Sequence, residues 1–160
     1  ADAPVDVAVV EVGMGGAWDA TNVVEAPVCV VLPIDIDHRH FLGDTVEEIA
    51  TEKSGIITAD GITVMGLQPH EEAAVILRDK ADEVGARLVA EGIDYGVTAR
   101  DVAVGGQQIS VKGLAAEYPD LFLPLHGPHQ AQNAATAIAA GRNRGEPEWL
   151  DDGDDVVERP

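Results

Sequence analysis

The sequence predicts an α/β fold, with a mostly parallel sheet flanked by helices and a small antiparallel hairpin sheet. Two β-branched apolar runs, at 5–13 and 28–34, end in Gly or Pro, as strands buried on both faces of a parallel sheet do. Helix and strand patterns then alternate up to about residue 92, which is the order of β-α-β units. At 160 residues, 46% of them hydrophobic, the chain is long enough to form a sizeable core.

The first predicted helix lies at 44–57. It begins with a capping Asp or Thr, has acids in its first turn and ends near Gly55. Its apolar residues Val46, Ile49 and Ala50 fall at helical spacing and predict one buried face.

The later elements are predicted from apolar periodicity and from turn residues. The hairpin is expected because apolar and polar residues alternate on both sides of a Gly-Gly turn. In order, we expect a strand at 62–66, an amphipathic helix at 70–86, a strand at 87–92, a hairpin at 95–113 turning at Gly105–Gly106, a strand from 122, and an Ala-rich helix from near His129 to Gly141.

Composition excludes several classes of function. Ten basic residues face 29 acidic ones, and the net charge of −19 repels nucleic acids and anionic membranes. No apolar stretch is long enough to span a bilayer, and Cys29 is the only cysteine, which excludes a disulfide framework. We therefore expect a cytoplasmic protein with neither a nucleic-acid nor a membrane partner.

The expected domain runs over residues 1–141. From 142 to 160 the apolar periodicity is lost while acids, Gly and Pro accumulate, so this segment is predicted to be an acidic, mobile tail.

The stretch EVGMGGAWDATN, residues 11–22, holds Gly13, Gly15 and Gly16. No glycine at position 18 completes a dinucleotide fingerprint, and no Gly-Lys-Ser/Thr completes a P-loop. A turn that ends a strand explains the glycines but leaves Glu11 unexplained. A carboxylate at the carboxyl end of a strand suits Mg²⁺ beside phosphates, which favours one wall of a site.

A second group follows the strand at 28–34. Asp35 and His38 come after it, and the predicted helix then presents Lys53. Each residue alone is more often a surface side chain. Together, and beside the strand that ends at Glu11, they are expected to converge on one edge of the sheet.

Three motifs together resemble the central ATP-dependent domain of folylpolyglutamate synthase/dihydrofolate synthase, in the Mur ligase superfamily. They are EVGMGGAWDATN, IDIDHRHFLGDTVEEIATEKSGI at 34–56 and HGPHQAQNAATAI at 126–138, in the family's order. The resemblance runs from about residue 5 to 140 and implies the family's P-loop-NTPase-like fold. It implies an ATP-dependent ligase that joins L-glutamate to dihydropteroate or to a folate through an acyl phosphate.

The resemblance also implies roles for particular residues. Glu11, His38 and a carbamylated Lys53 match the family's Mg²⁺-binding and catalytic positions. A carbamate supplies the anionic oxygen that an ammonium lacks. Asn133 matches the nucleotide-contacting Asn, with His129 and Gln130 as weaker neighbours. The substrate region would be formed by Gly15, Gly16, Asp19, Thr21 and Asn22.

The sequence departs from the family pattern in three places. Ala17 stands where the family has Arg after the glycines, and His40 stands where it commonly has an acid. The family's P-loop strand and its C-terminal domain have no counterpart in this sequence. Three hypotheses stay open: a ligase fragment that needs further segments, an inactive remnant that binds Mg²⁺ or nucleotide, and a Mur-type ligase of cell-wall precursors.

Overall fold

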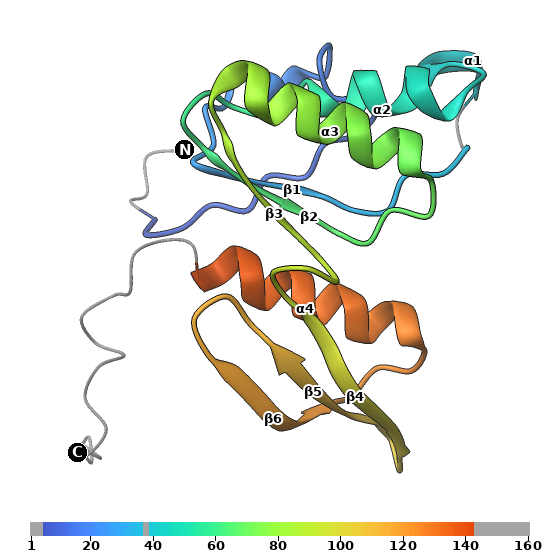
Figure 1. Ribbon diagram of the computed structural model, residues 1–160, viewed down its shortest axis with the longest axis vertical. Helices are drawn as coiled ribbons and strands as arrows, with labels where there is room; N and C mark the ends of the chain where they lie inside the picture. The colour runs from blue at the N-terminus through green and yellow to red at the C-terminus, as the bar shows by residue number, and fades with distance from the viewer. Residues whose placement is uncertain (1–4, 37–38, 143–160) are drawn as a thin grey trace. The chain divides into compact units, whose positions relative to one another are not determined.

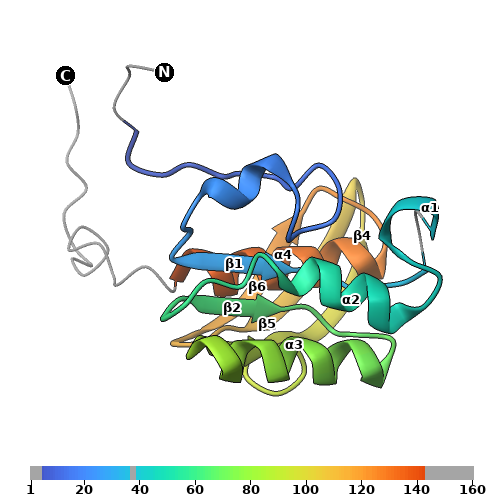
Figure 2. The same cartoon turned by 90° about the horizontal axis from the view of Figure 1, so that it is seen from above.

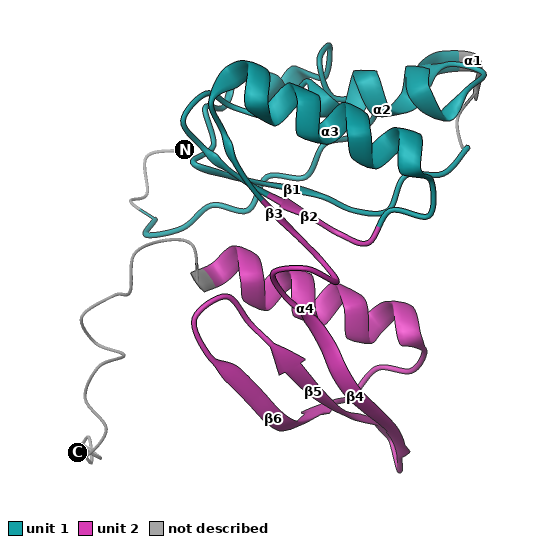
Figure 3. Ribbon diagram, in the orientation of Figure 1, with its two compact units in different colours: residues 1–63, 68–88 teal, residues 64–67, 89–160 magenta. Residues whose placement is uncertain are grey.

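The computed structural model describes residues 5–36 and 39–142 (Figure 1). The chain forms two compact units, residues 1–63 with 68–88 and residues 64–67 with 89–160 (Figure 3). The elements, in order, are η1 (Ala20–Val23), β1 (Val28–Val31), α1 (Arg39–Leu42), α2 (Val46–Ser54), β2 (Ile62–Met65), α3 (Glu71–Val84), β3 (Arg87–Ala90), β4 (Gly96–Ala103), β5 (Gly106–Lys112), β6 (Glu117–Leu123) and α4 (Pro128–Arg142).

A parallel sheet has the strand order β1-β2-β3, as the alternating pattern predicts. The first residues of β2 and β3 donate backbone hydrogen bonds to the residue that precedes the neighbouring strand, from Ile62 N to Pro27 O and from Arg87 N to Gly61 O, each at 2.9 Å. Helices α2 and α3 lie on the same side of β1 and β2 (Figures 1 and 2). The fold class predicted from the sequence is therefore confirmed.

Helix α2 begins where its capping residues predict. Thr45 is the N-cap, and its side chain accepts a hydrogen bond of 3.2 Å from Glu48 N. Glu48 reaches back in turn to the backbone N–H of Asp44 at 2.7 Å. The apolar face is buried as expected, since Ile49 and Ala50 are fully covered.

Helix α3 buries a narrow stripe. Ala73, Leu77 and Ala81, each four residues apart, are covered, while the residues between them are half-buried or exposed. The helix ends at Gly85, whose φ of 73° is the left-handed conformation that favours glycine at a helix end.

The antiparallel sheet has the order β4-β5-β6, and α4 packs on β4 and β5. Its hairpin turns at residues 104 and 105, one residue before the predicted Gly105–Gly106, because Gly106 already begins β5. Gly105 has φ of 79°, the left-handed conformation that suits glycine in such a turn. Strand β6 runs over 117–123, so the predicted strand from 122 was placed too late. The cause is the turn-like composition of 113–120, which hides strand pairing that depends on β5.

Residues 5–13 do not form the strand that their valines predict. This segment is irregular, and Val5, Val7 and Val9 are exposed. A strand forms only beside another strand of a sheet, and neither sheet in the described ranges 5–36 and 39–142 includes this segment. None of the described helices has the length and apolar character needed to cross a membrane.

Candidate functional site

The carboxylate of Asp19 holds the glycine stretch in its loop conformation. It accepts hydrogen bonds from Met14 N at 3.1 Å, Thr21 N at 2.8 Å and Thr21 Oγ1 at 2.5 Å. The Thr21 hydroxyl and amide, followed by the Met14 amide, lower the pKa of Asp19 to about 2. Asp19 is also the N-cap of η1, so it closes the loop and begins the helix that follows.

Asn22 completes this loop by donating from Nδ2 to the carbonyl oxygen of Ala17 at 3.0 Å. The Asp19, Thr21 and Asn22 side chains, expected in the substrate region, thus bind the backbone or side chains of their own loop. They give the stretch a fixed shape, which is the local role that Asx residues commonly have in turns.

The glycines let this loop lie directly against the end of α2. A methyl group added to Gly16 would be 2.4 Å from the carbonyl oxygen of Glu52, and one added to Gly15 would be 3.1 Å from Glu52 Oε1. The loop is also hydrogen-bonded there, with 3.0 Å from Ala17 N to Glu52 O and 3.2 Å from Trp18 N to Glu52 Oε1. The close approach that requires glycine is therefore between loop and helix.

Lys53 lies at this junction. It is half-buried in the last turn of α2, and a methyl group on Gly16 would come within 3.0 Å of its Cα. Glu11 is exposed and lies five residues before Gly16. The structure thus brings the loop that follows Glu11 against the helix that carries Lys53, although no strand ends at Glu11.

Metal ligation by Glu11, His38 and Lys53 stays a prediction, because His38 lies outside the described residues. In the ranges 5–36 and 39–142, no three His, Cys, Asp or Glu side chains gather as metal ligands would. Of the three predicted ligands, only Glu11 and His38 are residues of these four types, and the third is Lys53.

Two residues that the sequence analysis missed hold the segment after β1. Gln68 accepts from Ile34 N at 2.9 Å and donates to Leu32 O at 3.3 Å. His70 Nε2 lies 3.3 Å from Asp35 Oδ1, and hydrogen bonds from Ile36 N and then His70 lower the pKa of Asp35. Polar residues directly after the predicted strand at 62–66 were the available signal.

The predicted nucleotide residues lie at the start of α4, in the second unit. His129 and Asn133 are both exposed and are four residues apart, so they share one face of the helix. Gln130 is half-buried, and its backbone N–H donates to Gly127 O at 3.2 Å. This face offers an imidazole and an amide, which can donate to and accept from a nucleotide.

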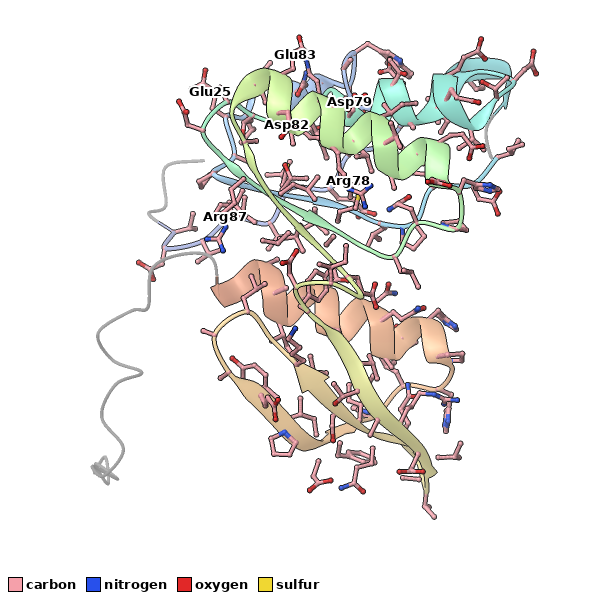
Figure 4. All side chains as sticks on the ribbon, in the orientation of Figure 1. Glu25, Arg78, Asp79, Asp82, Glu83 and Arg87 are labelled. Atoms are coloured by element: carbon pink, nitrogen blue, oxygen red, sulfur yellow. The ribbon has the colours of Figure 1, made fainter. Side chains whose placement is uncertain are left out.

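Exposed acidic side chains lie along α3 and beside α2. Figure 4 shows the side chains of Asp79, Asp82 and Glu83 along α3, and all three are exposed. A shallow pocket between α2 and α3 is also lined by acids, namely Glu47, Glu71 and Glu72. Carboxylates repel phosphate groups, so this pocket does not suit an anionic ligand.

A family model, the Mur ligase middle domain, matches residues 1–141. The chain belongs to this Mur ligase family.

The relatives of this Mur ligase domain include folate ligases. A dihydrofolate synthase/folylpolyglutamate synthase of Mycobacterium tuberculosis is 49% identical over 146 residues, which cover 88% of this chain and 30% of that protein. The corresponding enzyme of Bacillus subtilis is 37% identical and covers 91% of this chain and 32% of that protein. The chain thus spans about a third of the length of these relatives.

Solved structures agree with the fold of this Mur ligase domain. The folylpolyglutamate synthase of Mycobacterium tuberculosis, solved with ADP and AMPPCP, has a TM-score of 0.83 at 49% identity, covering 87% of this chain and 32% of that one. A complex of FPGS with AMPPCP and folate has a TM-score of 0.82 at 34% identity, covering 84% and 33%.

Proposed function

We propose that this chain is part of the central domain of an ATP-dependent ligase that joins L-glutamate to dihydropteroate or to a (poly)glutamylated folate. The observation that carries the proposal is the glycine loop seated on the end of α2 beside Lys53. It occurs in a Mur ligase domain 49% identical to a dihydrofolate synthase/folylpolyglutamate synthase. The folate branch is favoured over cell-wall precursors because the similar enzymes reported above act, by name, on folates.

The proposed reaction has two steps. The γ-phosphoryl group of ATP moves to the carboxylate of the folate substrate, which forms an acyl phosphate and releases ADP. The amino group of L-glutamate then attacks the acyl carbon, loses a proton, and displaces inorganic phosphate to leave an amide. Both steps depend mainly on placing the reactants and neutralising phosphate charge.

Glu11, His38 and carbamylated Lys53 would hold Mg²⁺, which neutralises the charge of phosphate oxygens when it is bound. The exposed Glu11 carboxylate is a hard oxygen donor, and a carbamate on Lys53 would be another. Lys53 is held in position by the loop against α2. These observations support the assignment, and the metal also accounts for how so acidic a chain would accept ATP.

His129, Gln130 and Asn133 would contact the nucleotide from the first two turns of α4. Their support is the shared exposed face of His129 and Asn133, and the solved relatives that contain ADP or AMPPCP. The buried thiol of Cys29, the only cysteine of the sequence, forms a hydrogen bond of 3.2 Å between its Sγ and Thr63 Oγ1. An unpaired thiol suits a reducing compartment, and we therefore place the enzyme in the cytoplasm.

The deciding experiment uses the longest product of the gene that encodes this segment. Release of ADP from ATP should require both dihydropteroate, or a folate, and L-glutamate. No release by the complete gene product under any of these combinations would contradict the ligase proposal. The 160-residue segment alone should be inactive, since it spans about a third of its relatives, and turnover by it would overturn that part.

Lys53→Ala tests the carbamate in the same protein. Activity should be lost, and short carboxylates such as formate or acetate should restore part of it by supplying the missing oxygen donor. Lys80→Ala is the matched control, because Lys80 is a helix lysine paired with Glu83 at 3.1 Å. Full activity in Lys53→Ala would remove Lys53 from the mechanism.

A further inference from the structure

One buried side chain, that of Gln107 on β5, holds the loop that leads into α4. Gln107 is 1% exposed. Its Nε2 donates to the carbonyl oxygens of Leu125 at 2.9 Å and Gly127 at 3.0 Å. These two carbonyls flank His126, so the backbone of the loop is bound on both sides of that residue.

The orientation of the Gln107 carboxamide is fixed by chemistry. Backbone carbonyls only accept hydrogen bonds, so the NH₂ group must face Leu125 and Gly127. On the other side, Arg100 Nη1 donates to Gln107 Oε1 at 3.2 Å. Both donors of the amide and its oxygen are therefore used, which suits a side chain with so little exposure.

The start of β5, which carries Gln107, is paired closely with the end of β6. Gln107 pairs with Leu123 in the antiparallel ladder. A methyl group on the adjacent Gly106 would lie 2.2 Å from the carbonyl oxygen of Leu123, so the two strands meet there without room for a side chain. The loop thus leaves β6 from a fixed point and is bound again two residues later.

Gly127 links the side chain of Gln107 to the first turn of α4. Its carbonyl oxygen accepts from Gln107 and also from Gln130 N in the first turn of the helix. Gly127 has φ of 97°, and a methyl group there would be 2.6 Å from the ring of His129. The position of this first turn, and with it the exposed face of His129 and Asn133, depends on where Gly127 is held.

We propose that Gln107 is a positioning residue that sets the affinity for adenine nucleotide by fixing the Leu125–Gly127 backbone ahead of α4. It acts through the first turn of the helix and does not contact the nucleotide itself. This inference rests on the function proposed above, because it takes the face of His129 and Asn133 as the nucleotide site.

The test compares three variants of the complete gene product with the wild type. Gln107→Glu keeps the size of the side chain and places acceptor oxygens against two carbonyls. Gln107→Met keeps the length and removes all polar groups. Gln108→Glu is the matched control, because Gln108 is the next residue on β5 and is exposed on the opposite face.

The measurements are the Kd for ADP by titration calorimetry and the KM values for ATP and L-glutamate. We expect both Gln107 variants to bind ADP at least fivefold more weakly, Gln107→Glu the more so, with KM for ATP raised in proportion and KM for L-glutamate within twofold. Gln108→Glu should stay within twofold throughout. General damage to the fold would raise both KM values together and would contradict a positioning role.

ADP binding within twofold of wild type in Gln107→Met, or in a folded Gln107→Glu, overturns the inference and leaves the proposed function standing. A wild-type protein that binds no ADP overturns both. The two failures are therefore distinguishable in one series of titrations.

Discussion

Replacing Gly16 by Ala tests whether the glycine loop is built to lie against α2. The added methyl carbon would be 2.4 Å from Glu52 O and 3.0 Å from the Cα of Lys53. Real methyl carbons essentially never approach an oxygen closer than 3.0 Å, so the loop and helix must separate by about 0.6 Å. That shift breaks the hydrogen bond from Ala17 N to Glu52 O, which is 3.0 Å long in the wild type.

The expected cost has two parts. Loss of one backbone hydrogen bond costs about 1 kcal/mol, and overpacking at a site that cannot relax costs about 1–3 kcal/mol. The free energy of unfolding should therefore fall by about 2–4 kcal/mol. With a urea dependence of about 2 kcal/mol per molar, the unfolding midpoint should fall by about 1–2 M.

The assay is urea unfolding followed by Trp18 fluorescence in a Trp149→Phe background, where Trp18 is the only tryptophan left in this sequence. Gly13→Ala is the matched control, because it makes the same change in the same loop. Its methyl group would meet only Asp19 Oδ2, at an ordinary 3.4 Å. The control midpoint should stay within about 0.5 M of wild type. Equal midpoints for the two variants would refute the role given to Gly16.

Two further predictions concern single polar groups. The pKa of Asp19 is lowered to about 2, so its charge stabilises the fold above the ordinary value near 3.8, and this stabilisation is lost as pH falls towards 2. Between pH 5 and pH 2 the urea midpoint of the wild type should thus fall more than that of Asp19→Asn, and parallel curves would contradict this. Tyr95→Phe should lower the free energy of unfolding by about 1–3 kcal/mol, because Tyr95 Oη donates to Met65 O at 3.0 Å and contacts Thr136 Oγ1 at 3.2 Å. Burial also raises the pKa of Tyr95 to about 12, so its phenol should stay protonated at pH 11 in an absorbance titration, and ionisation near pH 10 would argue against that burial.

Elements with strong local signals could be predicted from the sequence. Helix α3 lies within the predicted 70–86 because its apolar stripe and Gly85 act locally, and the Gly105 turn fixes its hairpin for the same reason. The segment 5–13 was misjudged because a strand depends on a neighbour that sequence periodicity does not reveal. Strand β6 was placed late for a related reason, since its pairing with β5 is not a local property.

The candidate site was predicted in outline only. Motifs placed the glycine loop and Lys53 in one site, and the structure brings them together. Gly16 makes room for the backbone of Glu52, and its place in a substrate region stays a prediction. Gln107 was not found, since a glutamine in a strand gives no signal until its two carbonyl partners, 18 and 20 residues away, are known.

Gln68 has a consequence for how the segment after β1 can move. Its carboxamide has the donor and acceptor of a peptide group, and it links Leu32 O and Ile34 N where the backbone ladder of β1 has ended. A backbone rung of a sheet opens only when a strand moves away. This side-chain rung depends on the χ angles of one half-buried residue. Rotation of the Gln68 side chain alone would therefore undo both of these hydrogen bonds while β1 and β2 stay paired.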